Sequence, residues 1–198
     1  MPWFWIVAGP NGAGKTTLVS AGVVARAAGV DLISLNADAR TAEILAADPD
    51  APDANLRAAI DTDARVAACI EDGVDFVVET VLSSDKYLDD VARAIALGYR
   101  IGVIYVGLVR PEASIRRVRQ RHERGGHDVP IDRIVDRWSR SIEMFGRLLP
   151  QAHEVFVFDN SSTDGPVLIA RKADGRITIL HPGRIPLIDA VLQANGAA

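Results

Sequence analysis

The sequence predicts an α/β fold with three αβα layers, in which a mainly parallel five-stranded sheet lies between two layers of helices. Short apolar runs typical of buried strands alternate with segments of helical periodicity along most of the 198 residues. A glycine-rich loop separates the first apolar run from the first helical segment. Near the C-terminus the alternation stops, and two β-like runs joined by Asp174-Gly175 predict a hairpin.

Each expected element follows from its local pattern. The strands are expected at residues 3–8, 31–35, 75–79, 100–108 and 154–158. The helices are expected from residue 16 onward, at 39–47, 54–72 and 85–97, from 111 to Gly125-Gly126, at 130–149 and at 186–193. The hairpin strands are expected at 167–173 and 176–180. Pro111 and Pro130 favour helix starts. We expect one domain over 1–198, with a helical lid at about 117–137 and a hairpin and helix at about 166–194.

The composition is that of a globular domain with a full core, at 48% hydrophobic and 24% charged residues. A formal net charge of −4 argues against a general binder of nucleic acid or of anionic membranes. The longest apolar stretch, residues 101–109, is too short to span a bilayer, and the apolar N-terminus lacks the basic lead of a signal peptide. We therefore expect a cytoplasmic protein without nucleic-acid or membrane partners.

Residues 9–16, GPNGAGKT, fit the pattern G-x-x-x-x-G-K-[ST] of a phosphate-binding loop. Glycines let the backbone turn its N–H groups around phosphates, which a glycine-rich turn without a ligand would not need. Lys15 is expected to reach the β- and γ-phosphates, and Thr16 to offer its hydroxyl to Mg²⁺. ATP and Mg²⁺ are thus the expected cofactors. The expected nucleotide contacts are Gly9, Pro10, Asn11, Gly12, Ala13, Gly14, Lys15, Thr16 and Thr17.

Carboxylates follow several of the expected strands, where ligands of parallel sheets collect. Asp38 has the position of a general base that would accept a proton from an attacking hydroxyl, or else it caps the following helix. Glu79, with Thr80, would serve Mg²⁺, its waters or a substrate, and otherwise would be a solvated edge residue. Asp159 suits a turn, and Asn160 a contact with the adenine edge.

Two arginine stripes flank the glycine pair. Their spacing of four and three residues places each stripe on one helix face. Such stripes either pair with nearby acids such as Glu123 and Asp136 or, when a lid carries them, stabilise the charge of a transferred phosphate. The first stripe is Arg117, Arg121 and Arg124, and the second is Arg133, Arg137 and Arg140.

The motifs together resemble the zeta toxin superfamily of small-molecule kinases, in particular its short bacterial members. The resembling segments are GPNGAGKTT at 9–17, NAD at 36–38, FVVET at 76–80, Arg117-Val118, RGGHDVP at 124–130 and FDNS at 158–161. The resemblance implies a P-loop kinase fold and transfer of the γ-phosphate of ATP to a hydroxyl of a sugar nucleotide of the UDP-N-acetylglucosamine type. It also implies a toxin role, with a small antitoxin protein as partner.

The same resemblance implies roles for particular residues. Asp38 would be the general base, and the phosphate clamps would be Lys15 with the lid arginines Arg117, Arg121 and Arg124. The substrate side would comprise Asn36, Arg40, Glu79 and Thr80.

Two other functions fit the same motifs. One is a metabolic P-loop kinase of the gluconate or adenylylsulfate type. The other is a regulatory switch without acceptor chemistry, in which ATP orders the lid for a protein partner. A positioned carboxylate facing an open acceptor pocket would favour a kinase, and a blocked pocket would favour the switch.

Overall fold

The computed structural model describes residues 1–123 and 129–197, and its centre is a seven-stranded sheet in the order β2-β3-β1-β4-β5-β6-β7. The five strands β1 to β5 pair in parallel, whereas β6 pairs antiparallel with both β5 and β7. The strands are β1 (Trp3–Ala8), β2 (Ile33–Asn36), β3 (Phe76–Thr80), β4 (Arg100–Gly107), β5 (Glu154–Asp159), β6 (Val167–Ala173) and β7 (Arg176–Ile179). The α/β class and the mainly parallel sheet are confirmed.

The predicted count of five strands is wrong. The hairpin does form between β6 and β7 at Asp174-Gly175, but β6 also pairs with β5 along its length. A free β5 edge would leave a row of backbone N–H and C=O groups unpaired, and the hairpin satisfies them. The hairpin is therefore part of the central sheet.

The helices agree with prediction except after the glycine-rich loop, where one expected helix is two short ones. Gly22 adopts a φ of 70° and ends the first of them. The helices are α1 (Lys15–Ser20), α2 (Val23–Ala28), α3 (Ala37–Ala47), α4 (Ala54–Asp72), α5 (Lys86–Ala96), α6 (Pro111–His122), α7 (Ile131–Leu148) and α8 (Pro186–Ala194). Within residues 1–123 and 129–197, no helix is both long and apolar enough to cross a lipid bilayer.

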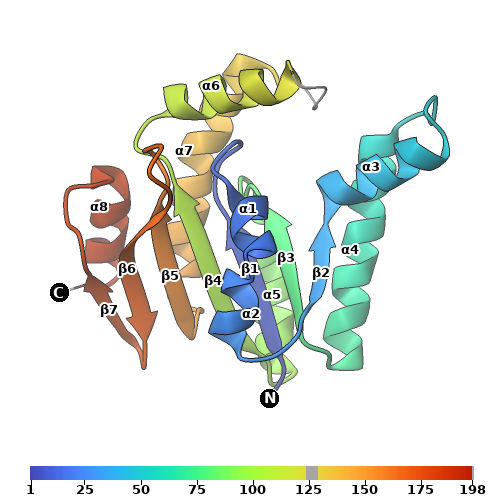
Figure 1. Ribbon diagram of the computed structural model, residues 1–198. Helices are drawn as coiled ribbons and strands as arrows, with labels where there is room; N and C mark the ends of the chain where they lie inside the picture. The colour runs from blue at the N-terminus through green and yellow to red at the C-terminus, as the bar shows by residue number, and fades with distance from the viewer. Residues whose placement is uncertain (124–128, 198) are drawn as a thin grey trace.

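Helices cover both faces of the sheet (Figure 1), which confirms the three layers. Side chains of β1 alternate between the two resulting cores. Phe4 and Ile6 belong to the core beneath α4, α5, α7 and α8, whereas Trp5 and Val7 belong to the core beneath α1 and α2. All four side chains are fully buried, as expected for β1, the central strand of the five parallel ones.

The strand order brings the carboxyl ends of β2, β3, β1 and β4 together at one edge of the sheet. Across this edge lies α6 (Figure 1). The predicted lid at 117–137 is only partly separate from the core, because the first turns of α7 are already anchored through buried Ile134 and Trp138. Arg124 and the Gly125-Gly126 pair fall outside the described residues.

Two glycines of β4 predict a graded loss of stability. A Cβ on Gly102 would lie 2.3 Å from the indole of buried Trp5. A Cβ on Gly107 would lie 2.6 Å from the terminal Cδ1 atoms of Ile185 and Ile188, and at an ordinary contact distance of 3.6 Å from the carbonyl oxygen of Phe158. Gly102→Ala should lower the free energy of unfolding by about 3 kcal/mol, because a packed ring cannot move aside. Gly107→Ala should cost about 1 kcal/mol, because methyl ends can rotate. Urea denaturation measures both, and equal losses would contradict this account.

Candidate active site

The glycine-rich loop packs tightly against β4 and the end of β5. Gly9 has a φ of 144°, and a Cβ there would lie 2.2 Å from the carbonyl oxygen of Val106. Gly14 has a φ of 95°, and its Cβ would lie 2.5 Å from the amide nitrogen of Asn160. That amide donates to the carbonyl of Ala13 at 2.8 Å. These positions require glycine, and the loop backbone is fixed as a phosphate cradle requires.

Lys15 is buried at the bottom of the loop. Its ammonium donates to the carbonyls of Gly9 and Pro10, at 2.8 and 3.1 Å. Burial lowers the pKa of Lys15 to about 8, although the carboxylates of Glu79 and Asp38 oppose this shift. The loop thus carries a desolvated cation held by neutral acceptors, which suits it for binding an anion.

Glu79 joins three neighbouring strand ends. Its Oε1 accepts a hydrogen bond from the Thr16 hydroxyl at 2.7 Å, and its Oε2 accepts one from the Asn36 amide at 2.8 Å. The side-chain oxygen of Asn36 accepts the backbone N–H groups of Asp38 and Ala39, at 2.8 and 3.2 Å. Asn36 therefore caps α3, and the alternative role of Asp38 as the cap is wrong. Since β3 lies between β2 and β1, Glu79 is also not on an edge strand.

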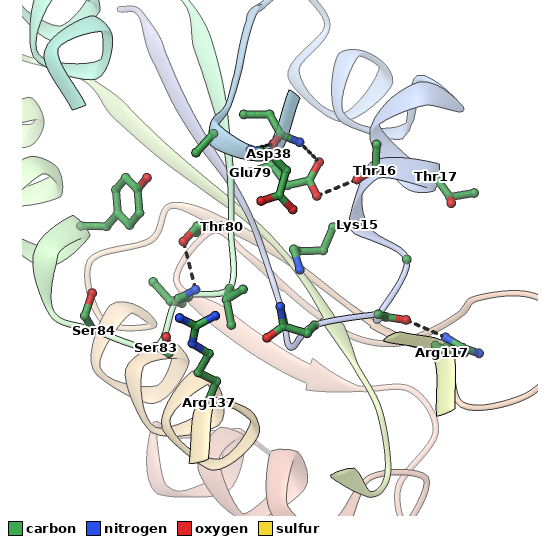
Figure 2. A pocket seen from close by; sticks show the side chains of 18 of the residues that line it. Lys15, Thr16, Thr17, Asp38, Glu79, Thr80, Ser83, Ser84, Arg117 and Arg137 are labelled. Atoms are coloured by element: carbon green, nitrogen blue, oxygen red, sulfur yellow. Dashed lines mark hydrogen bonds between the residues drawn. The ribbon is translucent and has the colours of Figure 1, made fainter. Parts of the chain in front are cut away.

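A cavity of about 530 Å³ opens between these groups (Figure 2). It combines the loop with side chains from β2, α3, β3, α6 and α7. The predicted site residues that line it are Asn11, Gly12, Gly14, Lys15, Thr16, Thr17, Asn36, Asp38, Glu79, Thr80, Arg117 and Arg121. Lys15 and Thr16, which would hold phosphate and metal, thus share one open space with Asp38.

Other predicted residues lie outside the cavity lining. Gly9, Pro10, Ala13 and Asn160 build or support the loop without lining the cavity. The predicted substrate role of Arg40 has no support in this geometry, because Arg40 pairs instead with Asp61 at 2.8 Å and Glu43 at 2.9 Å.

The arginines of the two stripes differ in their surroundings. Arg117 and Arg121 line the cavity, whereas Arg140 pairs with Asp136 as a solvated stripe would. The Arg117 guanidinium donates to the carbonyls of Gly12 at 3.3 Å and Asn160 at 2.7 Å, so it also ties the loop to the end of β5. Arg124 lies outside the described residues.

The turn role predicted for Asp159 agrees with its contacts. Asp159 is buried at the end of β5, where Oδ1 accepts the backbone N–H of Ser161 at 2.9 Å. Its Oδ2 accepts the Arg184 guanidinium at 2.8 Å. Asp159 therefore shapes the turn that presents Asn160 to the glycine-rich loop.

Sequence reasoning missed one wall of the cavity, the segment between β3 and α5. Leu82 adopts a φ of 55° there, with its side chain buried and its N–H donating to the Thr80 hydroxyl at 3.0 Å. The available signal was the position of this segment directly after Glu79-Thr80. The missed lining residues are Val81, Leu82, Ser83, Ser84, Lys86 and Tyr87.

The residues present fit ATP and Mg²⁺. Magnesium usually takes one or two protein oxygens and completes its shell with water and substrate phosphates. The Thr16 hydroxyl and the Glu79 carboxylate, 2.7 Å apart, offer such oxygens beside the phosphate loop. Within residues 1–123 and 129–197 no group of three or more His, Cys, Asp or Glu side chains is arranged to hold a metal alone. The donor set therefore matches a metal shared with phosphate.

The fold and the site define a P-loop nucleotide-binding protein of the kinase type, in which the loop follows the central strand and carboxylates stand at the neighbouring strand ends. The chain belongs to the Zeta toxin family, whose family model matches residues 1–174. This confirms the predicted resemblance. No curated protein matches the chain.

Solved structures show the same fold at low identity. A chain of the AvrRxo1-ORF1:AvrRxo1-ORF2 complex with sulphate ions is 16% identical, with a TM-score of 0.72 over 97% of this chain and 64% of that one. A chain of the AvrRxo1-ORF1:-ORF2 structure with ATP is 17% identical, with a TM-score of 0.70 over 91% of this chain and 61% of that one. A chain of the PezAT toxin-antitoxin system of Streptococcus pneumoniae is 15% identical, with a TM-score of 0.67 over 98% of this chain and 84% of that one. The chain thus spans about 64% of the AvrRxo1-ORF1:AvrRxo1-ORF2 relative's length.

Asn36 should contribute to stability in two separable ways. The serine of Asn36→Ser keeps a capping oxygen, but its side chain is too short to reach Glu79. This variant should therefore lower the free energy of unfolding by about 1 kcal/mol. Asn36→Ala removes the capping oxygen as well, and should lower the free energy of unfolding by about 2 kcal/mol. Urea denaturation of the three proteins measures these differences. Equal stability of the two variants would contradict the capping role.

Lys15 should make nucleotide affinity depend on pH. Since its pKa in the free protein is about 8, the cation that attracts phosphate is present below pH 8 and is lost above it. The Kd for ATP should rise roughly tenfold per pH unit above pH 8, as measured by calorimetry. Lys15→Ala is the control, with weaker binding that changes little between pH 7.5 and 9.5. A flat profile in the unmodified protein would refute the assignment.

Proposed function

We propose that this protein is an ATP-dependent kinase that transfers the γ-phosphate to a hydroxyl of a small molecule. The observation that carries the proposal is that the phosphate loop shares one cavity with the Asp38 carboxylate, which makes no hydrogen bond or ion pair with the described residues. The Asp38 side chain faces the space lined by Lys15 and Thr16, while Asn36 performs the capping that Asp38 would otherwise be needed for.

Each residue has a defined task in the transfer. Lys15 and the arginines Arg117 and Arg121 bind the phosphates and stabilise the negative charge of the transferred group. Thr16 and Glu79 would hold Mg²⁺, which would supply charge neutralisation at the phosphates. Asp38 accepts the hydroxyl proton as the acceptor oxygen bonds to the γ-phosphorus and the bond to the β-phosphate oxygen breaks. ADP and a phosphate monoester result.

We propose a sugar nucleotide of the UDP-N-acetylglucosamine type as acceptor and a small antitoxin protein as partner. Family membership supports the acceptor class, and the likeness to a chain of the PezAT toxin-antitoxin system supports the partner. The open cavity beside Asp38 favours a kinase over a switch without acceptor chemistry. An acceptor typical of a metabolic kinase remains an outcome of the experiment below.

The test is transfer itself. Purified protein is incubated with ATP, Mg²⁺ and a panel of sugar nucleotides, nucleosides and sugar acids, and mass spectrometry detects the gain of one phosphate. Slow ATP hydrolysis with every acceptor unmodified would overturn the proposal.

Variants should separate chemistry from binding. Asp38→Asn should lower kcat by a hundredfold or more, because a general base contributes on the order of 10²–10⁴, while the ATP affinity changes little. Lys15→Ala should weaken both. Glu43→Gln is the matched control, since Glu43 lies on α3 with Asp38 but outside the cavity, paired with Arg40. Full activity in Asp38→Asn would show that Asp38 is not the general base.

A further inference from the structure

Arg137 lines the cavity but, unlike Arg117, makes no hydrogen bond with the phosphate loop. It lies on α7, half-buried, and its guanidinium has no hydrogen bond or ion pair with the described residues. Its neighbours in the stripe differ, because Arg140 pairs with Asp136 and Arg133 is exposed outside the cavity. An unneutralised guanidinium in a cavity is suited to bind an anion.

The position of Arg137 is fixed by contacts on either side of it. The adjacent Trp138 donates its indole N–H to the carbonyl of Leu108 at 3.1 Å. Ser141, one helical turn later on the same face, donates to the carbonyl of Val81 at 2.7 Å and accepts from the Tyr105 hydroxyl at 3.1 Å. These bonds hold α7 against the segment that follows β3, so Arg137 is directed at that segment.

The surroundings of Arg137 are those of an acceptor subsite. Figure 2 shows Arg137 on the side of the cavity that carries Ser83, away from Arg117. Ser83 and Ser84 add hydroxyl groups to this wall, and the other cation there, Lys86, pairs with Asp63. Arg137 is therefore the unpaired cation of this wall among the described residues.

Resting on the proposed function, we propose that Arg137, with the hydroxyl groups of Ser83 and Ser84, binds an anionic group of the phosphate acceptor. The acceptor then lies with its reactive hydroxyl at Asp38 and its anion at Arg137. Arg137 determines specificity, because an uncharged analogue leaves a cation without a partner. It does not contact the nucleotide donor.

Kinetics separate this role from a donor role. The acceptors are the matched pair UDP-N-acetylglucosamine and N-acetylglucosamine, or the corresponding charged and uncharged pair for whichever acceptor the transfer panel identifies. Arg137→Gln should raise the KM of the charged acceptor about ten- to a hundredfold and leave the KM of ATP unchanged. Arg137→Lys should restore part of the affinity for the charged acceptor, because lysine keeps the positive charge but lacks the paired N–H donors of the guanidinium. Arg140→Gln is the control on the same helix. A rise confined to the KM of ATP would overturn the proposal.

A binding experiment distinguishes failure of this proposal from failure of the kinase proposal. The protein is saturated with Mg²⁺ and a non-hydrolysable ATP analogue, which blocks the phosphate loop, and is titrated with inorganic pyrophosphate or with malonate. Binding of either probe that is lost in Arg137→Gln supports the anion subsite even where no acceptor is phosphorylated. The preferred probe identifies the group as phosphate or carboxylate. Equal binding to Arg137→Gln and the unmodified protein, or no binding to either, would refute the subsite.

Discussion

The carboxylate of Glu79 is the contact on which the site depends. It links the Thr16 hydroxyl, just after the loop that follows β1, to the Asn36 amide at the end of β2. The sheet register places Asn36 directly opposite Glu79, so this link follows from strand pairing. Because Asn36 also caps α3, the first turn of that helix, and with it Asp38, is positioned by the same residue. The metal-side oxygens and the proposed base are therefore parts of one hydrogen-bonded unit.

A second set of contacts fixes the loop from the opposite side. Gly9 lies against the backbone of Val106, and the Asn160 amide supports the carbonyl of Ala13. Arg117 adds a bond from α6 to the end of β5. The loop is thus held by β4, β5 and α6, while Thr16 is held by β3. Backbone N–H groups fixed in this way need no reorganisation when phosphate binds, which is the advantage of a preorganised site.

The sequence predicted what local patterns determine and missed what packing determines. The cavity-lining residues of the phosphate loop, together with Asp38 and Glu79, could be singled out because strand ends and glycine spacing are visible in a short window. The pairing of β6 with β5 could not, because an edge partner is chosen by the whole sheet. Arg40 was assigned to the substrate from the resemblance, and a sequence motif does not reveal that α3 packs on α4 and its Asp61. The Leu82 conformation, at a positive φ, depends on burial and on Thr80 rather than on a turn residue.

The partners of each cation explain why the cavity is suited to an anion although the chain is acidic overall. Arg40 and Arg140 lie against carboxylates, which neutralise them. Lys15 and Arg117 instead donate to carbonyl oxygens, which satisfy their hydrogen bonds without forming an ion pair. Phosphate then competes with neutral dipoles instead of with a salt bridge, so its binding does not require an ion pair to be broken. The cations Lys15, Arg117, Arg121 and Arg137 thus share the cavity at the carboxyl end of the sheet with the carboxylates of Asp38 and Glu79.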